Sequence, residues 1–522
     1  MTSKLLSSEE AVKLVKNGDS LATVGFVGTH PEELSMMLEK RFLETGEPRN
    51  LNLMYCSGQG DGKEKASNHY GHPGLVKRVI AGHYNLAPKL GKLVTDNLVE
   101  GYCLPQGCLV HLLRSQASRK PGMITHVGLK TFADPRVEGG KINAKAKASD
   151  DVVKLINIGG KEYLHYLPVP LNVAFIRGST ADEDGNISME REFTFTEAYH
   201  MALATKNQGG IVICQVERMA ARGSLHPQLV KVPGVLVDYV VVAKPENHMQ
   251  NNTVQYDGSC SGEFRRPLGS VPPMMMSDRK VIARRCVQEL APKVTLNLGI
   301  GMPDGVSSVA TEEGIADQIT LTLEGGPYGG VPSAGIDFGA AYNPVAILSQ
   351  PDMFDMYDGG LLDIAYLGLA ETDGKGNVNV SKFGGRVAGP GGFINISQNA
   401  KKVVFCGTLT AGGLKVEIRD SKLNILQEGK MKKFVKQVEQ ITFSGDYAIE
   451  AGQQVLYITE RAVFELKPAG VTLIEIAPGI DLQKHILDQV EFDVNVSPNL
   501  KLMDARLFQD AVMGIKDEIL AK

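Results

Sequence analysis

The chain has 522 residues, of which 43% are hydrophobic and 22% charged, and its formal net charge is −4. A chain of this length exceeds the size at which one hydrophobic core keeps growing, so we expect at least two globular domains. No block of like charge is long enough to bind nucleic acid, and no apolar run approaches the roughly 20 residues that span a bilayer, so neither partner is expected.

The cysteines and histidines argue against two further kinds of site. Seven cysteines are scattered through the sequence, and no two are spaced as C-x-x-C. Their odd number and the apolar runs around some of them indicate buried thiols in a reducing compartment. Eleven histidines show no zinc-ligand spacing, so no metal site is expected. The N-terminus has no signal or transit pattern, and we therefore expect a cytoplasmic protein.

In chain order, the first predicted elements are a helix, a strand and a glycine turn. Ser7-Ser-Glu-Glu10 has the pattern of a capping box and predicts a helix start. A strand is expected over residues 20–24, and Gly25-Phe-Val-Gly28 follows it directly. Pro31 then predicts the start of another helix at about residue 32.

The second half of the chain begins in the same order. A helix is expected over residues 278–290, a strand over 294–298, and then a tight turn at Gly299-Ile-Gly301 that opens another helix. Later segments also correspond at a constant offset of 191 or 192 positions: 173–187 with 364–378, and 207–214 with 399–406. A constant offset indicates two copies of one α/β unit.

The two copies set the expected domain boundaries. Residues 244–276 contain Pro272-Pro273 and little apolar periodicity, and we interpret them as a linker between domains at 1–243 and 277–522. Strands alternate with helices in both domains, which predicts open, largely parallel sheets with helices on both faces. A pair of neighbouring strands is expected near residues 455–466.

The most informative motif lies at residues 319–332. Apolar residues alternate with Thr320, Thr322 and Glu324, which is the pattern of a strand. Glu324 would therefore stand at the C-terminal end of a strand, where open α/β sheets bind ligands. Glycines follow it directly and leave the backbone bare. A carboxylate placed in this way can act as a covalent nucleophile, and the alternative is a solvated residue of a plain turn.

Three other places are candidates for binding. Gly299 and Gly301 place backbone N–H groups at a helix start, which suits an anion. Gly389-Pro-Gly-Gly392 can present N–H groups to a developing oxyanion. Gln106, between a proline and a glycine, can donate to a carbonyl oxygen. The alternatives are two plain turns and a surface glutamine, and the sequence shows neither a P-loop nor a Ser-His-Asp arrangement.

Long motifs make the sequence resemble a known family. The motif Glu324-Gly-Gly-Pro-Tyr-Gly-Gly-Val-Pro332 is accompanied by others, among them Asp358-Gly-Gly-Leu-Leu-Asp363, Tyr457-Ile-Thr-Glu-Arg461 and Leu502-Met-Asp-Ala-Arg506. From about residue 8 to about residue 516, the chain resembles the class I coenzyme A transferases, and most closely the fused propionate/acetate, or short-chain acyl, CoA-transferases.

The resemblance implies a fold and a set of site residues. The fold would be two tandem related open α/β domains, of the kind shared with glucosamine-6-phosphate deaminase and ribose-5-phosphate isomerase. The first would be an α-type domain and the second a β-type domain that carries the nucleophile. Glu324 matches the nucleophilic glutamate and Gln106 a glutamine that faces the acyl oxygen, while Gly25 and Gly28 loosely match a glycine loop. The residues matching CoA-binding positions are Gly299, Gly301, Gly391, Gly392 and Lys415.

The activity implied is ping-pong transfer of CoA between short-chain carboxylic acids, through an acyl-glutamyl anhydride and a glutamyl-CoA thioester. CoA would be a substrate and part of the covalent intermediate, with no permanently bound cofactor. The protein would be a homo-oligomer such as a tetramer. Alternatives are an acyl-CoA hydrolase on the same scaffold, a non-enzymatic sensor of small acids or sugar phosphates, and a sugar-phosphate isomerase or deaminase.

Overall fold

A computed structural model describes residues 4–267 and 273–522. The chain forms two compact units, each assembled from several segments. Within the described residues, unit 1 comprises 4–266, 323–355 and 384–395, and unit 2 comprises 267, 273–322, 356–383 and 396–522. The compact units therefore differ from the two continuous halves expected from the sequence. Of the expected linker, 244–266 belongs to unit 1, and 268–272 lies outside the described residues.

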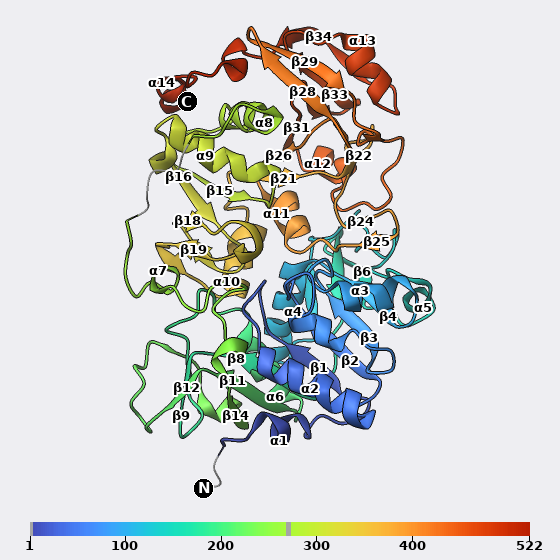
Figure 1. Cartoon of the computed structure of the whole chain (residues 1–522). Coiled ribbons are helices and arrows are strands. Elements are labelled where there is room, and N and C mark those ends of the chain that lie inside the picture. The colour runs from blue at the N-terminus through green and yellow to red at the C-terminus, as the bar shows by residue number, and fades with distance from the viewer. Residues whose placement is uncertain (1–3, 268–272) are drawn as a thin grey trace. The chain divides into compact units, whose positions relative to one another are not determined.

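Unit 1 is built on a seven-stranded parallel sheet in the order β14-β11-β8-β1-β2-β3-β4. Strands from the blue and the green parts of the chain share this sheet (Figure 1). Its central strands β1 and β8 are buried along their whole length, as expected for a parallel sheet covered on both faces. The strands are β1 Ser20–Thr23, β2 Leu51–Tyr55, β3 Val76–Ala81, β4 Glu100–Cys103, β8 Val173–Arg177, β11 Ile211–Val216 and β14 Tyr239–Val242.

The helices of unit 1 follow the strands. The predicted capping box is present, because Ser7 Oγ accepts from the Glu10 N–H and the Glu10 carboxylate accepts from the Ser7 N–H. The helix that it starts is short and ends at Val12. The main helices are α1 Ser8–Val12, α2 Glu32–Thr45, α3 Pro88–Thr95, α4 Gln106–Ala117 and α6 Ala198–Asn207, with α4 packed on α6 and α1 on α2.

Unit 1 also has smaller elements. A four-stranded sheet has the order β12-β9-β10-β13 and a three-stranded sheet the order β5-β7-β6. Their strands are β5 Met123–Thr125, β6 Val153–Ile158, β7 Lys161–Tyr166, β9 Thr180–Asp182, β10 Ile187–Ser188, β12 Arg218–Ala220 and β13 Val230–Val232. The segment 323–355 adds β17 Pro327–Tyr328, β18 Val331–Pro332, β19 Ala341–Tyr342 and β20 Ala346–Ile347, and leads into α10 Gln350–Asp358.

Unit 2 repeats the central part of this plan. Its main sheet contains the run β16-β15-β21-β26, and the sheet of unit 1 contains the run β2-β1-β8-β11. The segments that the sequence pairs at an offset of 191 or 192 residues thus occupy matching places, β8 with β21 and β11 with β26. The internal repeat is confirmed. The strands are β15 Val294–Leu298, β16 Ile319–Thr322, β21 Ile364–Gly368 and β26 Lys402–Cys406.

The rest of unit 2 extends this sheet and covers it. Beyond β26 come β31 Gln454–Ile458 and the antiparallel strands β32 Ala462–Lys467 and β33 Gly470–Ile476, which confirms the strand pair expected near residue 460. β34 Asn495–Leu502 closes this edge, and the helices include α8 Asp278–Val287, α9 Gly305–Glu312 and α12 Gly445–Glu450. None of the helices in the described ranges is long and apolar enough to cross a membrane.

Candidate active site

Glu324 lies in a tight turn that begins just after β16. The Gly326 N–H donates to the Leu323 carbonyl at 2.9 Å, and the Leu323 N–H donates to the Pro327 carbonyl at 3.0 Å, so the turn is closed from both ends. The Glu324 side chain is partly buried, which differs from a fully solvated turn residue. The turn therefore fixes the backbone of a residue that is half-enclosed by the protein.

The glycines beside Glu324 are required by the protein's own packing. A Cβ on Gly325 would lie 2.5 Å from Cε1 of Phe26, and one on Gly326 would overlap the Leu348 carbonyl oxygen. The bare backbone that the sequence predicts after Glu324 is therefore not open at Gly325, because the ring of Phe26, a residue of the glycine loop that follows β1, occupies the space there.

Gly25 and Gly28 shape that loop. The Phe26 N–H donates to the Thr29 carbonyl at 2.9 Å, and a Cβ on Gly25 would approach the same carbonyl oxygen to 2.9 Å. A Cβ on Gly28 would overlap the backbone of Asn252. Both glycines therefore permit close backbone contacts that hold Phe26 in place. The structure thus brings Gly25 and Gly28 to the Glu324 turn through Phe26.

Gln106 is a buried residue, which contradicts its interpretation as a surface glutamine. It is 1% exposed and is the first residue of α4. Its backbone N–H donates to the Gly391 carbonyl at 2.9 Å, and a Cβ on Gly391 would lie 3.7 Å from Gln106 Oε1. Gly392 is buried directly before α11 Phe393–Asn399. The structure thus places the glycine loop at 389–392 against Gln106.

The remaining predicted site residues belong to unit 2. The Gly299 N–H donates to the Tyr366 carbonyl at 2.8 Å, and the Gly301 N–H donates to Asp304 Oδ2 at 3.1 Å. Both N–H groups are thus engaged within the protein. Burial raises the pKa of Asp304, whose carboxyl group accepts the hydrogen bond from the Gly301 N–H. Lys415 is exposed at the first residue of β28 Lys415–Arg419.

Sequence reasoning missed three polar residues around the Glu324 turn. The Thr194 hydroxyl donates to the Gly325 carbonyl. Gln350, at the start of α10, accepts from Ser57 Oγ at 3.0 Å and from Gln106 Nε2 at 3.4 Å. Only Ser57 had a usable signal, because it follows the C-terminal end of a parallel strand, where such sheets place polar site residues.

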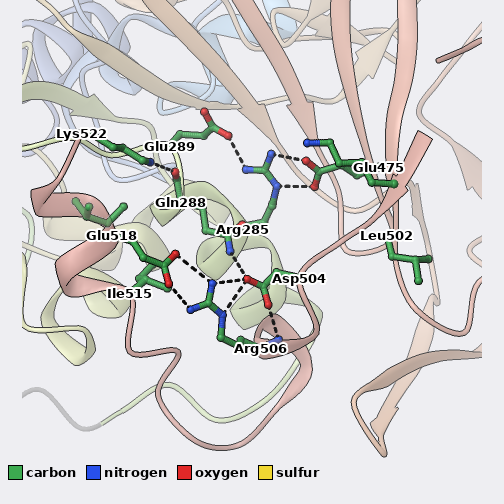
Figure 2. A pocket seen from close by; sticks show the side chains of 12 residues that line it. Arg285, Gln288, Glu289, Glu475, Leu502, Asp504, Arg506, Ile515, Glu518 and Lys522 are labelled. Atoms are coloured by element: carbon green, nitrogen blue, oxygen red, sulfur yellow. Dashed lines mark hydrogen bonds and ion pairs between the residues drawn. The ribbon is translucent and has the colours of Figure 1, made fainter. Parts of the chain in front are cut away.

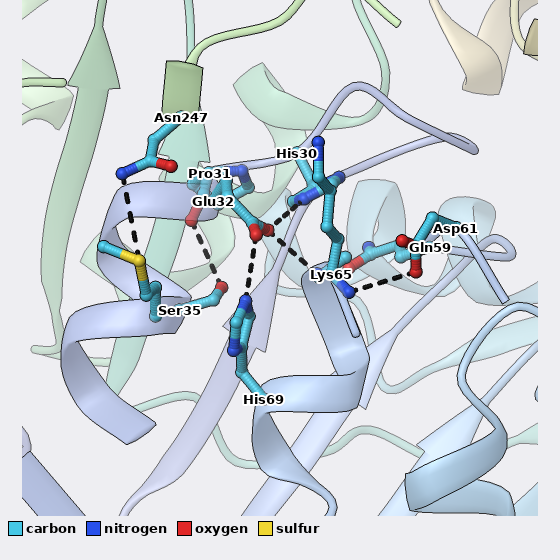
Figure 3. A network of polar contacts seen from close by, with 12 residues as sticks. His30, Pro31, Glu32, Ser35, Gln59, Asp61, Lys65, His69 and Asn247 are labelled. Atoms are coloured by element: carbon cyan, nitrogen blue, oxygen red, sulfur yellow. Dashed lines mark hydrogen bonds and ion pairs between the residues drawn. The ribbon is translucent and has the colours of Figure 1, made fainter. Parts of the chain in front are cut away.

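A buried network of histidines and glutamates lies beneath the glycine loop. Figure 3 shows the Glu32 carboxylate between the rings of His30 and His69. His30 Nε2 lies 2.5 Å from Glu32, and His69 bridges Glu32 at 2.9 Å and Glu39 at 2.5 Å. Burial opposes charging of the His69 ring, but hydrogen bonds to Glu32 and Glu39 outweigh it and raise its pKa to about 9. This network fixes the start of α2 next to the loop.

Glu197 is a second buried carboxyl group in unit 1. It lies at the N-terminal end of α6 and is fully buried, and this burial raises its pKa to about 8. Its neighbour Thr196 connects it to the residues above, because the Thr196 carbonyl accepts from the Gln350 N–H at 3.1 Å. The interior next to Thr196 and Gln350 therefore contains a carboxyl group that favours its neutral form.

Unit 2 contains a cavity of about 530 Å³, which is a competing candidate site (Figure 2). Arg285 lies between Glu289 and Glu475, at 2.6 and 2.8 Å, and Arg506 pairs with Asp504 at 2.6 Å. These guanidinium groups are thus neutralised within the protein. Paired charges of this kind are typical of structural networks, so the cavity is a weaker candidate. Across the described ranges, no cluster of histidine, cysteine and acidic side chains could hold a metal ion.

Known proteins similar to this chain cover nearly all of it. Residues 5–243 match the family model for coenzyme A transferase. The chain is 47% identical to the caffeate CoA-transferase of Acetobacterium woodii, over 99% of this chain and 100% of that protein. It is 44% identical to the acetate CoA-transferase YdiF of Escherichia coli (strain K12), over 98% and 96% of the two chains. A crystal structure of the acyl-CoA transferase YdiF from E. coli O157:H7, in a thioester complex with CoA, matches with a TM-score of 0.92 and 43% identity, over 98% of this chain and 97% of that one.

Proposed function

Because this chain belongs to the coenzyme A transferase family and is a CoA-transferase, we propose that it moves CoA between short-chain carboxylic acids through a covalent intermediate on Glu324. The observation that carries this proposal is the Glu324 turn. Its carboxylate is partly buried, and the turn is held by Phe26 on one side and Leu348 on the other. A nucleophile that must attack in one geometry benefits from such rigidity.

The proposed reaction has two symmetric halves. A Glu324 oxygen attacks the thioester carbonyl of the acyl-CoA, and the C–S bond breaks. The CoA thiolate departs, and Glu324 is now part of an acyl-glutamyl anhydride. The thiolate then attacks the glutamyl carbonyl and expels the first carboxylate, which leaves a glutamyl-CoA thioester. A second carboxylate attacks this thioester, and the same steps in reverse release the new acyl-CoA. The crystal structure of the relative from E. coli O157:H7 is a thioester complex with CoA, which supports this route.

The neighbouring residues receive supporting roles in this proposal. Gln106 and the glycine loop at Gly25 and Gly28 would surround the acyl oxygen, and one oxyanion donor is typically worth about 3–4 kcal/mol. Binding of the distant CoA body would supply the energy that forces the weak carboxylate nucleophile into place. The residues proposed to bind CoA are Gly299, Gly301, Gly391, Gly392 and Lys415. Because the N–H groups of Gly299 and Gly301 are engaged within the protein, these two would contribute by letting the ligand approach the backbone closely and not as donors.

The acyl group is proposed to be small because the Phe26 ring occupies the space directly above Gly325. Acetate, propionate and butyrate are the acids that this packing favours. One relative, however, is named for caffeate, an aromatic acid, at 47% identity. We therefore include caffeate among the acceptors to be compared, and its rate relative to acetate decides between the two classes.

The decisive experiment is a mass measurement on the protein with acetyl-CoA alone. The peptide that contains residue 324 should gain the mass of CoA minus water, and Glu324→Gln should not gain it. Addition of propionate should remove the adduct and produce propionyl-CoA. Free thiol without a second acyl-CoA would instead identify the hydrolase alternative, and an adduct on another residue would refute the assignment of Glu324.

We also propose that the enzyme is a cytoplasmic homo-oligomer such as a tetramer. All seven cysteines are buried free thiols, which supports a reducing compartment. Light scattering coupled to size exclusion would test the assembly, since a particle of 56.3 kDa would be a monomer and contradict it.

A further inference from the structure

Gln350 is a buried polar residue to which the proposed mechanism gives no role. It is fully buried at the start of α10. Its Oε1 accepts two hydrogen bonds, from Ser57 Oγ and from Gln106 Nε2, while its own Nε2 has no hydrogen-bond partner among residues 4–267 and 273–522. Leaving a buried N–H unpaired is costly. The orientation of the carboxamide is therefore set by the two hydrogen bonds that its oxygen accepts.

Two chains of contacts connect Gln350 to the turn that carries Glu324. In the first, Leu348, two residues before Gln350, donates its N–H to the Gly326 carbonyl at 2.9 Å. In the second, the Gln350 N–H donates to the Thr196 carbonyl at 3.1 Å, and the Thr196 N–H donates to Thr194 Oγ1 at 3.0 Å. The Thr194 hydroxyl in turn donates to the Gly325 carbonyl. Gln350 is thus fixed relative to the turn at both of its glycines.

On its other side, Gln350 contacts Gln106. The backbone of Gln106 is held by the Gly391 carbonyl at 2.9 Å, so only the direction of its side-chain amide remains to be set. A primary amide has two N–H bonds in one plane. When Gln350 Oε1 accepts one of them, the direction of the other is determined.

We propose that Gln350 is a positioning residue for acyl transfer. Held by Ser57, its carboxamide oxygen orients the Gln106 amide so that the second N–H of Gln106 meets the acyl oxygen while Glu324 attacks. This inference rests on the proposed function and adds a residue to it. The substrate group recognised is the carbonyl or carboxylate oxygen of the acyl moiety.

The test is a double-mutant cycle between Gln350 and Gln106. Gln350→Met keeps the length of the side chain and removes the acceptor, and Gln106→Ala removes the amide that is to be positioned. We expect Gln350→Met to lower kcat by about 10- to 100-fold, the size of loss caused by a small misplacement of a reacting group. KM for the acyl-CoA should change by less than about 2-fold, because ground-state binding is retained. In the Gln106→Ala background, the same substitution should lower kcat by less than about 2-fold.

Ser57→Ala provides a second variant if Gln350→Met does not fold. It removes one donor to Gln350 and should reduce kcat by about 3- to 10-fold, again only when Gln106 is present. Two results would overturn the inference: equal losses in the presence and absence of Gln106, or a normal kcat in the folded single variants. If the wild-type enzyme forms no adduct at residue 324, the proposed function fails. If it forms the adduct and the Gln350 and Ser57 variants behave normally, only the present inference fails.

Discussion

Phe26 lies directly against Gly325, the residue that follows Glu324. A Cβ on Gly325 would lie 2.5 Å from Cε1 of the ring, and Gly339 faces the same ring atom closely. Phe26 is 3% exposed and packs in a buried apolar cluster with Val27 and Phe193. The position of the proposed nucleophile thus depends on an aromatic ring from a distant loop, held by dense packing.

Gly325→Ala should therefore reduce transfer strongly. The added methyl group would displace either the Phe26 ring or the turn, and overpacking of this kind typically costs about 1–3 kcal/mol of stability. We expect kcat to fall by at least about 10-fold, since a shift near 1 Å at a reacting group can cost about 100-fold. Steady-state transfer assays and thermal unfolding would measure both effects.

Phe26→Leu provides the matched control. A smaller side chain at position 26 should tolerate the new methyl group, so Phe26→Leu combined with Gly325→Ala should recover part of the activity lost by Gly325→Ala alone. Wild-type activity in Gly325→Ala would show that the contact with Phe26 does not position the turn.

Glu324→Asp tests the reach of the carboxylate rather than its charge. The aspartate is one methylene shorter, so its carboxylate oxygen would lie too far from the thioester carbonyl. Water could still reach that carbonyl. We expect transfer to fall by about 100-fold or more, with thioester hydrolysis becoming a larger share of the product. Chromatography of CoA products separates the two reactions. Undiminished transfer by Glu324→Asp, or by Glu324→Ala, would exclude a covalent role for this residue.

The internal repeat could be predicted from the sequence because similar short segments recur at a constant offset. Matching segments became β8 and β21 at equivalent places in two sheets. The composition of the compact units could not be predicted in this way. Residues 323–355 pack with unit 1, although the chain enters them from β16, because packing depends on contacts that local periodicity does not encode.

The polar surroundings of Glu324 show the same limit more sharply. Gln106 and Gln350 form a hydrogen bond although they are 244 positions apart in the chain. Each is preceded or followed by ordinary turn residues, so neither is distinguished from a surface glutamine by its neighbours. Glu324 could be proposed from the sequence because a strand pattern and a glycine motif converge on it.

His69→Gln should lower the stability of the folded protein most at neutral and mildly acidic pH. The pKa of His69 is raised from 6.5 to about 9 by its two glutamate partners, so the folded state binds this proton more tightly than the unfolded state. The stabilisation is fully present below about pH 6.5 and is lost as the pH rises to about 9. Thermal unfolding of both proteins between pH 6 and 9.5 should therefore show a difference that shrinks with rising pH.

The control for this series is His226→Gln, because His226 is an exposed histidine of the same unit. Its unfolding temperature should follow the wild type at every pH. A difference between wild type and His69→Gln that stays constant with pH would mean that the ring is held by packing and not by its charge.

Glu197→Gln should stabilise the protein relative to the wild type by an amount that grows with pH, because it removes a group that the folded state prefers to keep neutral. Burial raises the pKa of Glu197 from 4.5 to about 8. The folded state therefore retains a proton that the unfolded state has released, and stability falls as the pH rises from about 4.5 to about 8. The neutral amide is close in shape and has no proton to lose. We expect the urea midpoint of Glu197→Gln to rise relative to that of the wild type across this range, by an amount that levels off above pH 8.

Glu9→Gln, a substitution at an exposed position, is the control and should show no such trend. If the midpoints of Glu197→Gln and wild type changed in parallel with pH, the charge of Glu197 would lie in a solvated site.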